Sequence, residues 1–320
     1  MDEKKIPVAA TQFNHAPGDK AYNLGIVEKM SREAAARGVR IIAFPEMCIT
    51  GYWHVRNLGE DEIRALAENA RSGPSVRNLE ALSKELGLII GAGIIEEAED
   101  GRLYNTYIVT QPDRPVRFHR KLHCFISPHM SSGDSFTVIE TSLGVKLGVL
   151  TCWDNNLTEN ARITALAGAD ILLAPHQTGG CYNRSDRVMG RIDVQLWENR
   201  HRDPEALRRE FLGSKGREWL CRWLPSRAHD NGMFLIFSNG VGRDDDEVRT
   251  GNAMLIDCHG DIAAESVAIE DDMVIGEFDL TLLEECLGRN WIQGRRPELY
   301  GPLTIPTGRE KDSRTLKFME

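Results

Sequence analysis

The chain has 320 residues, 41% of them hydrophobic, with a formal net charge of −9 and a pI of about 5.6. This length and composition allow a sizeable core, in one large domain or two smaller ones. The acidic balance excludes nucleic acid and anionic membrane surfaces as default partners. No apolar run approaches membrane-spanning length and the charged N-terminus lacks a signal-peptide pattern, which predicts a cytoplasmic protein without a membrane partner.

The seven cysteines are an odd number and form no C-x-x-C pair. This pattern argues against a disulfide framework and against a zinc knuckle. A metal site built from His123, His129 and Cys181 lacks the usual ligand spacing, so no metal is expected.

Strands and helices alternate from the start of the chain. Residues 6–13 have the pattern of a buried strand, residues 19–37 that of an amphipathic helix closed by Gly38, and residues 39–44 that of a second strand. A second helix is predicted over residues 74–86, with Gly87 as its stop. The β-rich runs that follow predict consecutive sheet strands at residues 86–97, 103–111 and 114–121.

The second half continues the same alternation. A hairpin is predicted from residues 137–141 and 145–152, followed by a helix at about 158–168 and a strand at 170–175. Three more β-rich runs, separated by turn residues, occupy residues 233–240, 252–265 and 272–280. The alternating pattern therefore predicts an α/β protein with buried sheets.

Two segments depart from this pattern. Residues 179–216 are rich in Arg and Glu, with helical periodicity only in their second half, and we interpret them as an insertion. The insertion either forms a solvated helical face, or covers the active-site mouth, or adds to a subunit interface. Residues 295–320 form a polar, proline-bearing C-terminal tail, and the whole chain, 1–320, is predicted to be a single domain.

Three reactive residues lie at the ends of apolar runs. Glu46 follows VRIIAFP, Lys121 follows RPVRFHR, and Cys152 follows VKLGVLT. Strand ends are where an α/β fold gathers its reactive groups. Taken singly, each residue also has a structural interpretation, as a helix cap, part of a basic run, or a small buried hydrophobe.

A carboxylate, an ammonium and a thiol at one site can together catalyse acyl transfer, each in a different role. The carboxylate accepts the thiol proton, and the thiolate attacks a carbonyl or nitrile carbon. Lys121 then stabilises the developing oxyanion together with the backbone N–H of Trp153. This chemistry needs no metal or organic cofactor.

Longer motifs surround these three residues. They are FPEM with ITGYW, RKLH, LGVLTCWDNNLTENARITALAGADILLAP, WLPSRAHDNGMFLIFSNGVG and GNAMLIDCHGDI. In this order they resemble the carbon-nitrogen hydrolase (nitrilase) superfamily, in its amidase-like branch, along nearly the whole chain. The resemblance implies a four-layer α-β-β-α sandwich, a Glu46-Lys121-Cys152 triad, thioester chemistry on non-peptide C–N bonds, and a homodimer or larger assembly.

The sequence departs from the family at the loop after the lysine. Many members carry a second glutamate there, whereas this loop reads LHCFISPHMSSGD. His129, Ser127 or an acid from another segment are the candidate replacements, and the alternative is that His129 has no catalytic part. Leu157-Thr158-Glu159 also lacks the family's proline, from which we expect a structural effect only.

The resemblance also points to residues that border the substrate pocket. It places Tyr52 and Trp53 after the glutamate, and Asp154 and Asn155 after the nucleophile. His176 and Gln177 lie where the family has a loop over the active site. For Trp53 and His176, core packing and a structural hydrogen-bonded role remain the alternatives to substrate contact.

The expected function is an amidase-type hydrolysis of a small amide or N-carbamoyl substrate, with release of ammonia or amine. A nitrilase that converts a nitrile to a carboxylic acid is the first alternative. A hydrolase in which His123 or His176 activates Cys152 is another. A non-catalytic binding member of the family is the last, against which the intact Glu46, Lys121 and Cys152 argue.

Overall fold

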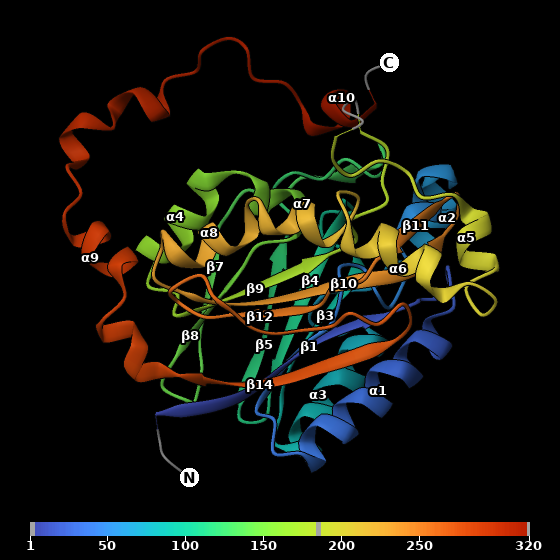
Figure 1. Cartoon of the computed structure of the whole chain (residues 1–320), viewed down its shortest axis with the longest axis horizontal. Helices are drawn as coiled ribbons and strands as arrows, with labels where there is room; N and C mark the ends of the chain where they lie inside the picture. Colours follow the sequence, from blue (N-terminus) through green and yellow to red (C-terminus); the bar gives the residue numbers. More distant parts are fainter. Residues whose placement is uncertain (1–3, 184–186, 319–320) are drawn as a thin grey trace.

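The computed structural model describes residues 4–183 and 187–318. Within these residues fourteen strands join in one mixed sheet, with α-helices on both sides (Figure 1). The strands are β1 (Lys5–Phe13), β2 (Ile41–Ala43), β3 (Ile89–Glu97), β4 (Leu103–Gln111), β5 (Arg114–Arg120), β6 (Met130–Ser131), β7 (Thr137–Glu140), β8 (Lys146–Val149), β9 (Ile171–His176), β10 (Phe234–Asp244), β11 (Glu247–Thr250), β12 (Met254–Ile256), β13 (Ile262–Glu265) and β14 (Asp272–Asp279).

The helices occupy most of the segments between these strands. The α-helices are α1 (Lys20–Ala36), α2 (Glu60–Leu66), α3 (Pro74–Leu86), α4 (Thr158–Leu166), α5 (Val194–Glu198), α6 (Pro204–Leu212), α7 (Arg217–Cys221), α8 (Leu224–His229), α9 (Leu287–Gln293) and α10 (Ser313–Phe318). The 3-10 turns are η1 (Trp53–Asn57), η2 (Cys152–Asn156), η3 (Leu280–Glu284), η4 (Pro297–Leu299) and η5 (Gly301–Thr304).

The sheet folds into two halves that meet at the carboxyl end of β1. The strand order is β5-β4-β3-β2-β1-β10-β9-β8-β7, but β1 and β10 pair only at Gln12↔Asn239 and Phe13↔Gly240. Away from this junction β1 pairs with β14, whereas β10 pairs with β12. The two halves therefore diverge and face each other across a shared core.

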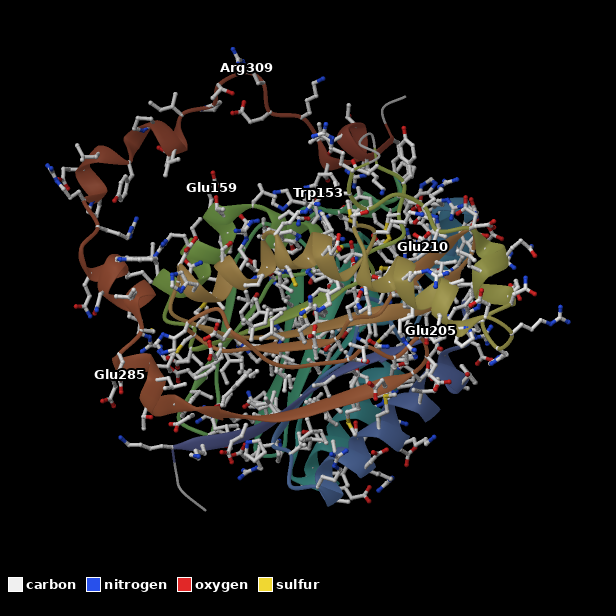
Figure 2. All side chains as sticks on the ribbon, viewed as in Figure 1. Trp153, Glu159, Glu205, Glu210, Glu285 and Arg309 are labelled. Carbon is white, nitrogen blue, oxygen red and sulfur yellow. The ribbon has the colours of Figure 1, made fainter. Side chains whose placement is uncertain are left out.

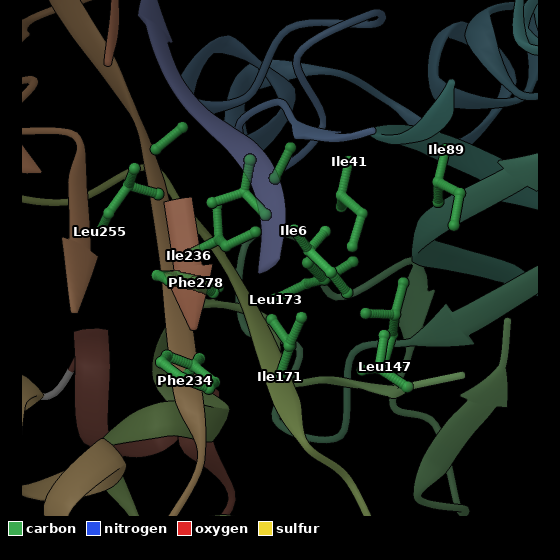
Figure 3. Close-up of a cluster of buried hydrophobic side chains, with 14 of the residues drawn as sticks. Ile6, Ile41, Ile89, Leu147, Ile171, Leu173, Phe234, Ile236, Leu255 and Phe278 are labelled. Carbon is green, nitrogen blue, oxygen red and sulfur yellow. The ribbon is translucent and has the colours of Figure 1, made fainter. Parts of the chain in front are cut away.

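Period-2 alternation divides each central strand between two cores. On β1, Val8 belongs to the core between the sheet halves and Ala9 to the core beneath the helices. On β10, Ile236 and Leu235 divide in the same way. Figure 3 shows the inner core, where Ile6, Ile41 and Ile89 of one half lie near Ile171, Leu173 and Ile236 of the other.

Helices cover the outer face of each half. α1 and α3 pack on β1, β2 and β3, while α4, α7 and α8 pack on β9, β10 and β12 (Figure 1). This arrangement confirms the predicted four-layer α-β-β-α sandwich. The predicted helix ends are also confirmed, because Asp19 caps α1 through the Tyr22 N–H and Gly87 ends α3 at φ +65°.

The two atypical segments lie on the outside of the sandwich, with α5 and α6 at the right of Figure 1 and α9 at the left. Residues 179–216 contain α5 and α6, which pack on β10 and β11 through Trp197, Leu207 and Phe211. After β14 the chain carries α9, η4 and η5 around the outside of the body and returns at α10 (Figure 1). None of the helices in the described residues combines the length and apolar content needed to cross a bilayer.

Candidate active site

Glu46 lies in a tight turn after β2 and is completely buried. Met47, the next residue, has φ +44°, and the Ile49 N–H donates to the Gly93 carbonyl at 3.1 Å. A Cβ on Gly93 would lie 2.0 Å from the Met47 nitrogen, so β3 accommodates the turn only with glycine there. This close approach fixes the position of the glutamate.

Lys121 follows β5, and its backbone N–H donates to the Asn105 carbonyl on β4 at 2.8 Å. Its Nζ lies 2.6 Å from Glu46 Oε1, and Asn105 Nδ2 donates to the same oxygen at 2.6 Å. Glu46 Oε2 has no hydrogen-bond partner among the described residues. The carboxylate thus has one oxygen held by two donors and one oxygen free to accept a proton.

Cys152 begins the 3-10 turn η2, three residues beyond the last residue of β8. It has φ +51°, a conformation that non-glycine residues rarely adopt. Such strain persists only where the surrounding structure imposes it, and it is common at functional sites. The residue is 8% exposed and lines a cavity, so the turn presents it to that cavity.

The charges around the thiol set its protonation. Burial raises the pKa of Cys152 to about 12, the Glu46 carboxylate adds to this increase, and Lys121 opposes it. Burial alone would lower the pKa of Lys121, but Glu46, and then Cys152, raise it above its ordinary value. The resting site therefore holds an ammonium and a neutral thiol beside a carboxylate.

Asp154 ties the segment after Lys121 to the turn of Cys152. Its Oδ2 accepts from the Leu122 N–H at 3.0 Å, and its Oδ1 accepts from the His123 N–H at 2.9 Å. The side chain is fully buried. Burial would raise the pKa of Asp154, but hydrogen bonds from His119 and His123 hold that pKa well below its usual range. The aspartate is therefore an anionic anchor between the two segments, and its oxygens face protein groups.

The cavity over Cys152 has a volume of about 230 Å³, and five of its fourteen lining residues are aromatic. Phe125 and Trp153 meet edge to face at 5.3 Å between ring centroids. Figure 2 shows Trp153 at the upper edge of the body, on the side over which the C-terminal tail runs. The cavity is lined by Tyr52, Trp53, Phe125, Cys152, Trp153, Asn156, Gln177, Thr178, Cys181, Met189, Trp219, Glu247, Arg249 and Lys317.

Some of the predicted pocket residues line the cavity, and others lie away from it. Tyr52, Trp53 and Gln177 line the cavity, and Gln177 Nε2 donates to the Glu46 carbonyl at 2.9 Å. His129 is not among the lining residues of the cavity, and its 37% exposed side chain lies 3.7 Å from Glu60. Substrate contact by the first three, and any catalytic part of His129, stay predictions.

Asn155 and His176 lie behind the nucleophile turn. Asn155 Nδ2 donates to the Leu150 carbonyl at 2.6 Å and lies 3.1 Å from His176 Nε2. Burial lowers the pKa of His176 to about 3, so this imidazole is neutral at ordinary pH. His123, in turn, faces Asp154 through Nδ1 at 2.8 Å. Neither histidine is among the groups that most strongly shift the pKa of the Cys152 thiol, whereas Glu46 and Lys121 are.

Several cavity and supporting residues escaped the sequence analysis. Asn105 is a polar residue inside the otherwise β-rich run LYNTYIVTQ, and this contrast is the one local sign of its contact with Glu46. Glu247 and Arg249 lie on β11, and Lys317 lies on α10. No local pattern brings these last three to the cavity, because long-range packing places them there.

Among the described residues, no group of three or more His, Cys, Asp or Glu side chains is arranged to hold a metal ion. The site contains a neutral thiol, a carboxylate with a free oxygen and an ammonium, next to the cavity. This set of groups suits nucleophilic attack on an uncharged carbonyl carbon.

Comparison with known proteins identifies the family. The model of the carbon-nitrogen hydrolase family matches residues 7–286. A hydrolase encoded in the pqqF 5′ region of Pseudomonas protegens is 28% identical, with 94% of this chain and 93% of that protein covered. N-carbamoylputrescine amidase of Arabidopsis thaliana is 26% identical, with 95% and 97% covered.

A solved structure supports the fold assignment. It is a mutant amidase from Nesterenkonia sp. AN1 with the acetamide moiety of fluoroacetamide on its active-site cysteine. It superimposes with a TM-score of 0.69 at 16% identity, over 95% of this chain and 98% of that one. The family match over most of the chain establishes that the protein belongs to the carbon-nitrogen hydrolase family.

Proposed function

We propose that this protein hydrolyses a small linear amide or N-carbamoyl compound at Cys152, with Glu46 as general base and Lys121 as oxyanion stabiliser. The observation that carries the proposal is the asymmetric Glu46 carboxylate. One oxygen accepts from Lys121 at 2.6 Å and the other has no hydrogen-bond partner among the described residues. A base needs such a free oxygen beside the thiol whose proton it takes.

The first half-reaction forms a thioester. Glu46 Oε2 takes the thiol proton as the Cys152 sulfur bonds to the amide carbon, and the carbonyl oxygen becomes an oxyanion. Lys121 Nζ and the Trp153 N–H donate to that oxyanion. The Trp153 amide lies in the first turn of η2, where N–H groups have no acceptor within the turn. Collapse breaks the C–N bond, and Glu46 returns the proton to the leaving nitrogen.

The second half-reaction releases the acid. Glu46 takes a proton from water, whose oxygen adds to the thioester carbon, and the same donors hold the second oxyanion. The C–S bond then breaks, Glu46 returns its proton to the sulfur, and the carboxylic acid leaves. An N-carbamoyl substrate gives a carbamic acid at this step, which decomposes to CO₂ and ammonia or amine. Glu46 thus acts alternately as base and acid, which suits a carboxylate in a dry site.

Two wider expectations complete the proposal. We propose a cytoplasmic location, because all seven cysteines are free, as in proteins of reducing compartments. We also propose a homodimer or larger assembly. Exposed apolar side chains on the outer C-terminal segment, Leu299, Leu303 and Ile305, support it, because such groups gain from burial against a second subunit.

Ammonia release tests the proposed function. Purified protein is incubated with short amides, N-carbamoyl amino acids, N-carbamoyl amines and nitriles, with Cys152→Ala as control. We expect turnover of an amide or N-carbamoyl compound that disappears in the variant. Turnover of nitriles alone, or turnover that survives in Cys152→Ala, would contradict the proposal.

A further inference from the structure

Arg249 is a buried cation in the wall of the Cys152 cavity. It lies on β11 and is 1% exposed. Its Nη1 lies 2.7 Å from Glu247 Oε2 and 2.6 Å from Cys181 Sγ. Its Nε lies 3.7 Å from Asp244 Oδ2, beyond hydrogen-bond distance. Nε and Nη2 have no hydrogen-bond partner among the described residues.

Unpaired donors of a buried guanidinium are unfavourable, because they have lost water without gaining an acceptor. Burial alone would lower the pKa of Arg249, but Cys181, Glu247 and Asp244 raise that pKa well above its ordinary value. The guanidinium therefore stays charged in the cavity wall. Its unused Nη2 suits an acceptor that a ligand brings into the cavity.

The sign of the free charges favours an anionic ligand. Glu247 is the carboxylate among the residues that line the cavity, and its oxygens already accept from Arg249 Nη1 and from the Tyr182 N–H at 2.9 Å. Lys317 is a second cation in the lining, and it uses one of its three ammonium protons on the Tyr182 carbonyl at 3.0 Å. The charged groups of the cavity wall that still have unused hydrogen-bonding atoms are therefore the two cations, Arg249 and Lys317.

Tyr52 relates this cation to the reacting end of the site. Its ring centroid lies 5.7 Å from Lys121 Nζ and 5.8 Å from Arg249 Cζ. The sum of these two distances is the upper limit on the separation of the cations, a span that a chain of a few carbons covers. The buried Tyr52 hydroxyl, between these two cations, also has no hydrogen-bond partner among the described residues.

From these contacts we infer that Arg249 forms a subsite for a carboxylate at the far end of the substrate. This inference rests on the proposed function, since it assigns the substrate class of the same site. The substrate then carries a scissile amide or N-carbamoyl group at one end and a carboxylate a few atoms away. Arg249 contacts the substrate and determines specificity, and it takes no part in bond breaking.

Matched substrates test the subsite with the unmodified protein. Glutaric acid monoamide is compared with pentanamide and with 5-aminopentanamide, which have the same chain length and a neutral or cationic end. A charge-assisted hydrogen bond is worth about 1.5–3 kcal/mol, so we expect kcat/KM for the monoamide to exceed that for pentanamide by roughly 10- to 100-fold. Equal rates, or a preference for the cationic amide, would overturn the inference.

The two proposals fail in distinguishable ways. If pentanamide turns over as well as the monoamide, the hydrolase stands and the carboxylate subsite falls. If no amide turns over, the proposed function fails, and calorimetric titration with glutaric acid monoamide and pentanamide decides the subsite alone. Tighter binding of the monoamide supports the subsite, and equal or absent binding rejects it.

Variants identify the residue responsible. Arg249→Met is expected to remove the preference for the monoamide over pentanamide, whereas Arg243→Met, an exposed arginine on the neighbouring strand β10, retains it. Arg249→Met removes the arginine partner of the buried Glu247 and can unfold the protein. In that case the double variant Arg249→Met with Glu247→Gln, which also removes the buried negative charge, is measured in its place. A folded variant without Arg249 that keeps the full preference would contradict the assignment.

Discussion

Glu46 and Lys121 form a fully buried ion pair, with Nζ 2.6 Å from Oε1 and side chains that are 0% and 1% exposed. An ion pair in this setting lacks competing water, so the partners depend on each other for charge compensation. Cys152 lies next to them, and both charges act on its thiol. The position of these two charges therefore influences the protonation of the Cys152 thiol.

Glu46→Gln tests the general base. The amide keeps the size and one acceptor of the carboxylate but takes no proton, so we expect kcat/KM to fall by roughly 10²- to 10⁴-fold. Glu97→Gln, on β3 with a 39% exposed side chain, is the matched control and should retain activity. Much activity left in Glu46→Gln would favour activation of Cys152 by a histidine instead.

The raised pKa of Cys152 predicts a late ionisation. The folded thiol keeps its proton until the pH approaches about 12, whereas a free thiol ionises near 8.5. The thiolate absorbance at 240 nm, taken as wild type minus Cys152→Ala, should therefore stay flat from pH 7 to 10. The unfolded chain releases this proton earlier, so this group's contribution to stability is complete below about pH 8.5 and is lost as pH rises towards 12. A step in the difference absorbance near pH 8.5 would show an exposed, unperturbed thiol.

Asp154→Asn tests the anchor between the Lys121 segment and the Cys152 turn. An amide oxygen replaces only one of the two acceptors, so the amide NH₂ meets the backbone N–H of either Leu122 or His123. We expect a loss of about 1.5–3 kcal/mol in unfolding free energy and a lower kcat. Denaturant unfolding and steady-state kinetics measure both, with the exposed Asp134→Asn as control. An unchanged unfolding midpoint would contradict the anchoring role.

The C-terminal helix predicts an effect on substrate affinity. Phe318 stacks on Trp53 with ring centroids 6.2 Å apart, and Lys317 lines the cavity. Phe318→Ala should widen the entrance and raise KM more than it lowers kcat. Leu316→Ala changes a 44% exposed residue of the same helix and is expected to leave KM unchanged. Equal kinetics for the two variants would place α10 outside the substrate path.

The strands and helices with strong local patterns were predictable from the sequence. The run IPVAATQF and the stop at Gly87 depend on nearby residues, so alternation and glycine conformation were sufficient to locate β1 and the end of α3. The two-halved sheet was not predictable from periodicity, because the short pairing of β1 with β10 depends on residues 227 positions apart, Gln12 and Asn239.

The site shows the same division. Motifs and their order pointed to Glu46, Lys121 and Cys152 as the candidate triad, and the structure brings Glu46 and Lys121 into direct contact. Arg249 and Lys317 were not, because each reaches the cavity by packing against Trp53, far away in sequence. Burial of the whole run EVRT could not be inferred from its polar composition.

The most direct test of the mechanism is to trap the acyl group on the enzyme. Protein mixed with a turned-over amide is quenched in acid within one turnover and digested, and the cysteine peptides are analysed by mass spectrometry. We expect the acyl mass on the Cys152 peptide in the wild type, with neither adduct nor ammonia release in Cys152→Ala. An adduct on Cys181 instead, or full turnover by Cys152→Ala, would contradict Cys152 as the nucleophile.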